Sequence, residues 1–150
     1  MRRVWLAGAA VAGAAWWKAC EIAKRDLQKN ITHTRTMRDK LHKGLGARIE
    51  DIKLNGHPKM RLPNTLSLSF QGIDATTLLS ELKEHVAVSA GAACHSKGDE
   101  ISRVLRAMNV PSSWARGTLR FSTGRMTTEL EIERATKIVS DAVAGIRKEG

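Results

Sequence analysis

Arg61-Leu-Pro-Asn-Thr-Leu-Ser-Leu-Ser-Phe70 is the stretch of sequence that decides the fold. Its second half alternates apolar residues with serine, which is the period-two pattern of a strand that buries one face. A second such segment follows at Thr118 to Ser122, where Leu119 and Phe121 face one way and Arg120 faces the other. Two half-buried strands predict a sheet whose apolar face needs a cover.

Further elements are predicted on either side of these two strands. Asp74 can cap a short helix, and Thr128 with Glu131 forms a capping box before a last amphipathic helix. The other expected elements are a helix from Lys18 to about Lys43, a strand around Ile49 to Leu54, a strand at His85 to Ser89, a helix at Glu100 to Met108 and a turn at Pro111 to Trp114. The predicted fold class is α+β, a small sheet covered by helices on one face.

Charge is distributed unevenly along the 150 residues, which have the length of one domain. Residues 1–62 hold 14 Lys and Arg against 5 Asp and Glu, and the remaining residues hold 11 against 10. A basic stripe attracts anionic partners. Here, however, it lacks the interleaved aromatic residues that stack on bases, so nucleic-acid binding is not expected.

The N-terminal residues 1–17 form an apolar segment of their own. Arg2 and Arg3 precede a 14-residue apolar run from Val4 to Trp17, which is shorter than the ~20 residues of a membrane span. No membrane span is therefore expected. The segment has two interpretations: an altered start of a long helix that begins before residue 18, or a weak targeting segment.

Two cysteines stand far apart in the sequence, without the spacing of a zinc site or a disulfide framework. No metal site is predicted, and a reducing compartment is expected. The cytoplasm is the expected location, with the mitochondrion as the alternative. Cys20 lies among small apolar residues of a helical stretch and is predicted to be a packed core residue.

The segment Ser89 to Ser96, SAGAACHS, places Cys94 among small residues directly after a predicted strand. A thiol in such a loop is reachable, which favours a nucleophile, whereas an isolated cysteine can also be a buried small hydrophobic residue. The thiolate is the reactive form, and a free cysteine has a pKa of about 8.5, so a neighbouring charge or cofactor has to activate it. His95 is adjacent and is a possible supporting residue, although consecutive side chains usually point apart.

Four segments in register resemble the cysteine desulfurases and selenocysteine lyases, which belong to the class V group of pyridoxal-phosphate enzymes. They are Arg61 to Phe70, Ser89 to Ser96, Ser102 to Met108 and Gly117 to Thr128. The residues AACHS look more like the selenocysteine lyase form of the loop than the usual desulfurase form. The resemblance implies that residues 18–150 are the small C-terminal domain of a fold-type I pyridoxal-phosphate enzyme.

The family holds pyridoxal phosphate on a lysine of a larger preceding domain, and the resemblance assigns no cofactor-binding residue to this chain. His42-Lys43 imitates the His-Lys pair of the cofactor lysine, but it falls on a charged helix well before the motifs that should follow. This pair is therefore interpreted as a solvated helix face. The chain alone is expected to be inactive, because the cofactor domain is missing.

The resemblance also assigns chemistry to residues. The Cys94 thiolate attacks the sulfur or selenium of a cysteine or selenocysteine substrate, which leaves alanine and a persulfide or selenosulfide on the protein. Arg120 is expected to bind the substrate carboxylate, with an ordinary surface salt bridge as the alternative. The implied partners are a sulfur or selenium acceptor protein and a second subunit of a homodimer. The alternative function is a non-catalytic binding module that docks on an intact desulfurase subunit or on a sulfur acceptor.

Overall fold

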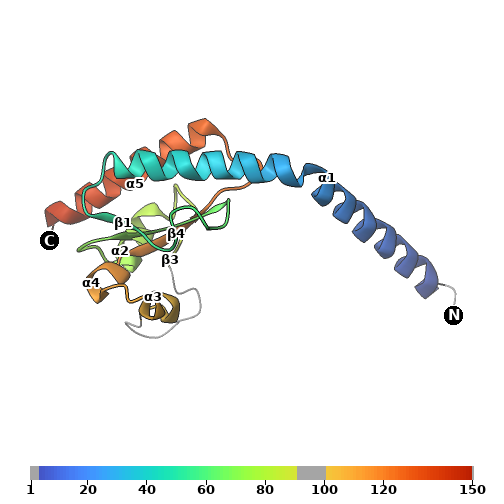
Figure 1. Cartoon of the computed structure of the whole chain (residues 1–150), viewed down its shortest axis with the longest axis horizontal. Coiled ribbons are helices and arrows are strands. Elements are labelled where there is room, and N and C mark those ends of the chain that lie inside the picture. Colours follow the sequence, from blue (N-terminus) through green and yellow to red (C-terminus); the bar gives the residue numbers. More distant parts are fainter. Residues whose placement is uncertain (1–3, 91–100, 150) are drawn as a thin grey trace.

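The computed structural model describes residues 4–90 and 101–149, and the side chains of residues 16–90 and 101–148 (Figure 1). The helices among them are α1 (Val4–Gly46), α2 (Ala75–Leu82), α3 (Arg103–Ala107), α4 (Ser112–Ala115) and α5 (Glu129–Glu149). The strands are β1 (Ile52–Leu54), β2 (Thr65–Phe70), β3 (Ser89–Ala90) and β4 (Thr118–Ser122).

The strands form one antiparallel sheet in the order β1-β2-β4-β3, which confirms the α+β prediction. In the central pair, Leu66 lies opposite Phe121 and Leu68 lies opposite Leu119. Because side chains alternate along a strand, this register gathers the apolar residues on one face and the serines on the other. The sheet therefore has an apolar face and a polar face.

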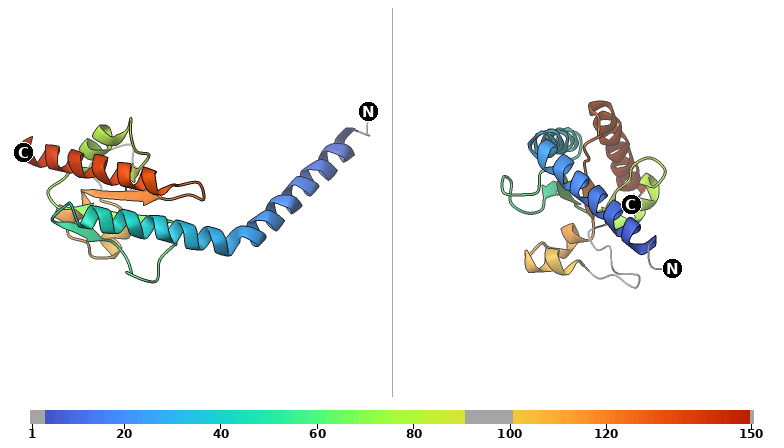
Figure 2. Two further views of the ribbon diagram at one scale, coloured as in Figure 1. Left: turned by 90° about the horizontal axis from the view of Figure 1, so that it is seen from above. Right: turned by 90° about the vertical axis from the view of Figure 1, so that its right-hand side faces the viewer.

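Helices α1 and α5 run side by side over the apolar face, and α2 lies next to α5 (Figure 2). The buried apolar residues between these helices and the sheet form one cluster. Its fully buried members are Leu45, Leu66, Leu68, Phe70, Leu78, Leu82, Leu119 and Val139. The two short helices α3 and α4 lie on the opposite side of the sheet (Figure 1).

Both predicted helix starts are confirmed. The Asp74 carboxylate accepts hydrogen bonds from the backbone N–H groups of Thr76 and Thr77 at 2.9 and 3.0 Å, so it satisfies two donors in the first turn of α2. At α5, the Glu131 carboxylate accepts from the backbone N–H of Thr128 at 2.7 Å, and the Thr128 hydroxyl accepts from the backbone N–H of Glu131 at 3.3 Å. This reciprocal pair is the predicted capping box.

Three local predictions differ from the structure. The strand expected at His85 to Ser89 begins only at Ser89, because the Leu82 carbonyl accepts from the backbone N–H groups of His85 and Val86 and prolongs the turn after α2. The turn expected at Pro111 to Trp114 contains the short helix α4. The strand expected around Ile49 to Leu54 begins only at Ile52, because the backbone N–H of Ile49 still donates to the Leu45 carbonyl at the end of α1.

Cys20 is exposed, so the prediction that it is a packed core residue is wrong. The N-terminal part of α1 extends beyond the sheet, and Trp16 and Trp17 there are 75% and 76% exposed (Figure 1). A small apolar side chain needs a neighbouring element to be buried, and the described residues place none beside this part of the helix.

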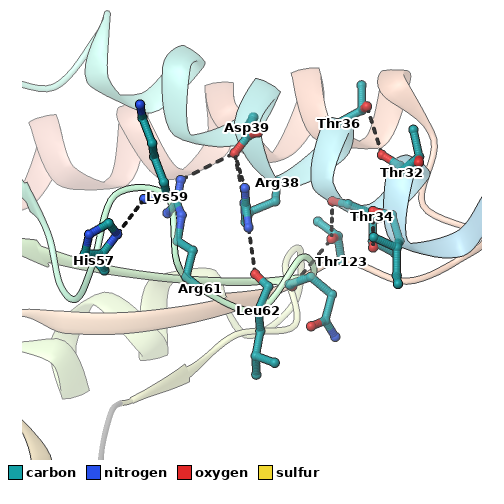
Figure 3. A network of polar contacts seen from close by, with 12 residues as sticks. Thr32, Thr34, Thr36, Arg38, Asp39, His57, Lys59, Arg61, Leu62 and Thr123 are labelled. Carbon is teal, nitrogen blue, oxygen red and sulfur yellow. Dashed lines mark hydrogen bonds and ion pairs between the residues drawn. The ribbon is translucent and has the colours of Figure 1, made fainter. Parts of the chain in front are cut away.

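The loop between β1 and β2 is held against α1 by charged side chains (Figure 3). Arg38, which is only 4% exposed, donates from Nη1 to the Leu62 carbonyl at 2.6 Å and pairs with Asp39 through Nη2 at 2.7 Å. Arg61 reaches the same Asp39 oxygen from the loop, at 3.4 Å. His42 lies close to this cluster and is half-buried.

Gly44 gives a first stability prediction, because α1 and α5 approach closely at this residue. A Cβ added at Gly44 would lie 2.9 Å from Cγ2 of Thr136, whose hydroxyl is itself bonded to the Ile132 carbonyl. We expect Gly44→Ala to destabilise the protein by about 1–2 kcal/mol, because the overpacked helices have to shift. Gly46→Ala is the matched control: it meets nothing within 4 Å and should stabilise the helix by up to about 0.5 kcal/mol. Urea unfolding measures both, and equal effects would contradict the close-approach argument.

His42 gives a second prediction, about pH. Burial lowers the pKa of His42, the charges of Arg61 and Arg38 lower it further, and Asp39 acts in the opposite direction. Below pH 6.5 or so, the unfolded chain binds a proton on His42 that the folded chain resists. The free energy of unfolding should therefore fall as the pH is lowered from about 7.5 to about 5.5, and His42→Gln should reduce this slope. Denaturant unfolding at several pH values measures it, and identical slopes for the two proteins would refute the assignment.

Candidate functional site

The polar face of the sheet carries a connected set of hydroxyl and amide groups. The side-chain amide of Asn55 donates to the hydroxyls of Ser67 and Ser69 at 3.3 and 2.8 Å. The Ser69 hydroxyl lies 2.7 Å from that of Thr118 on the next strand. Since Ser69 is fully buried and Thr118 is 2% exposed, these bonds satisfy polar groups that would be costly to bury alone. This face is therefore ordered by its own network.

Arg120 lies at the centre of this face, on β4. Its Cα partners are Ser67 on β2 and Ser89 on β3, so hydroxyl-bearing residues flank it on both sides. Directly opposite residues in an antiparallel pair have Cβ atoms about 4.5–5.5 Å apart. The strand residues of the polar face include no carboxylate.

The Arg120 guanidinium is exposed and makes no hydrogen bond or ion pair with any residue in the described ranges. The expected orientation is confirmed, because Leu119 and Phe121 on either side of it are 0% and 3% exposed on the opposite face. A planar guanidinium with free donors among neutral hydroxyls is suited to bind a carboxylate or another oxyanion from solution.

The segment with the predicted nucleophile begins beside Arg120. Ser89 and Ala90 of β3 pair with Arg120 and Leu119, and the description stops there and resumes at Ile101. Cys94 and His95 therefore lie outside the described residues. The first two residues of SAGAACHS thus form β3, which is paired with the strand of the predicted carboxylate-binding arginine.

His42 and Lys43 do not lie near this site. They belong to α1, which covers the apolar face, so the sheet separates them from Arg120 (Figure 2). His42 is half-buried and has its pKa lowered by burial and by the charge of Arg61, whereas Lys43 is exposed. The interpretation of this pair as a solvated helix face is right for Lys43 and wrong for His42, which is half-buried beside the β1–β2 loop.

The strand residues of the polar face do not fit pyridoxal phosphate. The cofactor requires a lysine for its aldehyde and an acid for its pyridine nitrogen. Lys53 is the lysine on these strands, but its ammonium is directed to the Trp114 ring, 6.0 Å from the centroid. No strand residue of this face is acidic. The face suits a carboxylate better than the cofactor.

Other parts of the described structure have fewer groups that could bind a ligand or take part in a reaction. Among the described residues, no group of three His, Cys, Asp or Glu side chains could hold a metal ion. No described helix is long and apolar enough to cross a membrane. A groove of about 620 Å³ lies between residues 84–87, the end of β4 and α5, with core residues such as Phe121 and Ile132 in its wall. Arg120 does not line it.

Sequence reasoning missed the network of Asn55, Ser67, Ser69 and Thr118. Its signal was present in the alternating serines of TLSLSF, which identified the strand but were not considered as a polar site. Asn55 could not be added from the sequence, because its contacts depend on the pairing of β1 with β2.

Known proteins resemble the chain over most of its length. The family model for class V aminotransferases matches residues 8–135. Cysteine desulfurase 2 of Trichormus variabilis is 37% identical over 131 residues, which are 87% of this chain and 33% of that protein. The cysteine desulfurase NifS of Azotobacter vinelandii is 40% identical over 130 residues, which are 86% of this chain and 32% of that protein.

A solved structure of a NifS-like protein matches with a TM-score of 0.71 and 29% identity, over 85% of this chain and 32% of that one. The chain thus spans about a third of the length of the curated relatives it matches. The matched residues include all four strands and most of the core. Sequence and fold therefore agree, and the chain belongs to the class V aminotransferase family.

Proposed function

We propose that the chain is the small domain of a pyridoxal-phosphate-dependent cysteine desulfurase or selenocysteine lyase. The observation that carries this proposal is the position of Arg120, exposed and unpaired among the described residues, beside the strand that leads to Cys94. The cysteine desulfurases among the relatives support sulfur transfer, and the AACHS residues support selenium as the other substrate element.

In this proposal the two residues have separate roles. Arg120 binds the substrate α-carboxylate through two parallel N–H···O bonds and so fixes the orientation of the amino acid. The Cys94 thiolate forms a bond to the substrate sulfur or selenium while the bond from that atom to Cβ breaks. The electron pair stays on the substrate carbon, which takes up a proton, so alanine and a Cys94 persulfide or selenosulfide result. Pyridoxal phosphate, bound outside this chain, supplies the electron sink.

The position of Arg120 suits this role energetically. An exposed arginine without a protein partner adds little to folding, so its donors remain available to a ligand. The hydroxyls of Ser67 and Ser89 beside it are neutral, and they neither compete as strong acceptors nor repel a carboxylate. The persulfide would then pass to an acceptor protein, and a homodimer is the proposed assembly of the intact enzyme.

Arg120 can be tested in a chimera that joins this chain to the first two thirds of the Azotobacter vinelandii enzyme. We expect Arg120→Gln to lower kcat/KM for cysteine by about 10–100-fold, since a charge-assisted pair contributes about 1.5–3 kcal/mol. Arg120→Lys should recover part of this loss. Folding should change by less than about 0.5 kcal/mol, because the side chain is exposed.

Arg134→Gln on α5 is the control, because it removes an exposed arginine away from the polar face. A similar loss in both variants would contradict the role of Arg120. The chain alone, mixed with pyridoxal phosphate and cysteine, should release no alanine. A chimera that binds the cofactor and still releases no alanine would instead favour the alternative, a non-catalytic docking module.

Cys94 is tested in the same chimera by a change that alters reactivity with little change in size. Cys94→Ser should abolish persulfide formation and leave the unfolding midpoint unchanged, because serine is a far weaker nucleophile at neutral pH. Since Cys20 is exposed, thiol labelling cannot separate the two cysteines by burial. Cys20→Ser is therefore the matched control and should retain persulfide, detected by mass spectrometry of the protein. A persulfide that survives Cys94→Ser would overturn the assignment.

A further inference from the structure

The cluster that joins the β1–β2 loop to α1 has more positive charge than its acidic partner can neutralise. Arg38 donates to Oδ1 of Asp39 from Nε at 2.9 Å and from Nη2 at 2.7 Å. Arg61 directs Nη2 to the same oxygen, at 3.4 Å. Two guanidinium groups therefore share one carboxylate oxygen (Figure 3). His42 is near enough for the charges of Arg61, Asp39 and Arg38 to shift its pKa.

Two donors of this cluster lack an acceptor. Nε and Nη1 of Arg61 are buried and form no hydrogen bond with any described residue. A buried donor without an acceptor loses its hydration and gains nothing in return, and the penalty is larger for a charged group. Burial and the charge of Arg38 also lower the pKa of Arg61, because both disfavour the charged form of its guanidinium.

The arrangement of the free donors identifies a ligand class. Nε and Nη2 of a guanidinium point the same way and form a planar fork that matches two oxygens of a phosphate or carboxylate, and Arg38 uses this same pair of nitrogens toward Asp39. In Arg61 the fork is complete once Nη2 leaves its 3.4 Å contact with Asp39, and Nη1 remains as a further donor. Arg38 cannot accept hydrogen bonds from these donors, since it is itself a cation. Asp39 already accepts from both arginines. A tetrahedral oxyanion supplies several acceptors and the missing negative charge together.

We propose that Arg61, Arg38 and His42 form a binding site for a small tetrahedral oxyanion of the phosphate type. The site lies on α1 and the β1–β2 loop, over the apolar face, and is separate from the polar face with Arg120. It is independent of the proposed desulfurase reaction.

The site lies just below the surface. The Arg61 side chain is 13% exposed and Asp39 is 50% exposed, so the anion has a short path to the cluster. Its entry displaces the 3.4 Å contact between Arg61 and Asp39, which is long for a charge-assisted hydrogen bond. The bond from Arg38 to the Leu62 carbonyl keeps the loop on the helix meanwhile.

Thermal unfolding of the full chain in sodium phosphate tests this site, with sodium chloride and sodium acetate at the same ionic strength. We expect a saturable rise in Tm with phosphate, of about 5–10 °C at 100 times Kd for a chain of this size. Arg61→Gln should remove the rise, and Arg134→Gln on α5 should keep it. The Nε–H signal of Arg61, followed by NMR in the wild-type chain, should shift with phosphate along the same saturation curve.

The NMR titration decides the result if Arg61→Gln fails to fold. Three outcomes would overturn the site: no saturable rise beyond that in chloride, an equal rise in Arg61→Gln, or an unshifted Arg61 Nε–H signal. A rise with acetate but not with phosphate would also overturn it and would point to a carboxylate as the natural partner.

Discussion

The antiparallel pairing of β2 with β4 is the interaction on which the rest of the structure depends. Its register places leucine and phenylalanine from both strands on one face. The same register places Ser67, Ser69 and Arg120 on the other face, because side chains alternate along a strand. A shift of one residue in either strand would mix the two sets and remove both the core and the polar face.

The two faces of the sheet are stabilised in different ways. The apolar face is covered by α1 and α5, which bury leucines from both strands. The polar face is ordered by hydrogen bonds between Asn55, Ser69 and Thr118, which satisfy groups that the strands bury. Arg120 is left outside this network, so β4 carries a cation whose donors form no hydrogen bond with any described residue.

A second constraint acts where the β1–β2 loop meets α1. The loop follows the helix because Arg38 bonds to the Leu62 carbonyl, and this contact carries Arg61 into the neighbourhood of another buried cation. Asp39 offsets the repulsion only in part, and His42 lies in the same positive field. Arg120 thus stands exposed on the polar face without a partner among the described residues, whereas Arg61 is confined between its loop and α1.

The sequence by itself determined the elements whose causes are local. The alternation in TLSLSF and in Thr118 to Ser122 predicted both central strands, the Asp74 cap and the Thr128–Glu131 box predicted two helix starts, and the orientation of Arg120 followed from the same alternation. The α+β class and the family resemblance also came from these segments. The role of Cys94 stays a prediction, because Cys94 lies outside the described residues.

Only the tertiary structure decided the features that join distant residues. Cys20 has the neighbours of a core residue in sequence, but burial depends on what packs against the helix, and Cys20 is exposed. The N-terminal part of α1 extends beyond the sheet (Figure 1). The first residue of β3 depended on how the turn after α2 closed, because that turn competes with strand pairing. The cluster of Arg38 and Arg61 arises because residues 23 apart in sequence meet across a loop, and no local pattern encodes that distance.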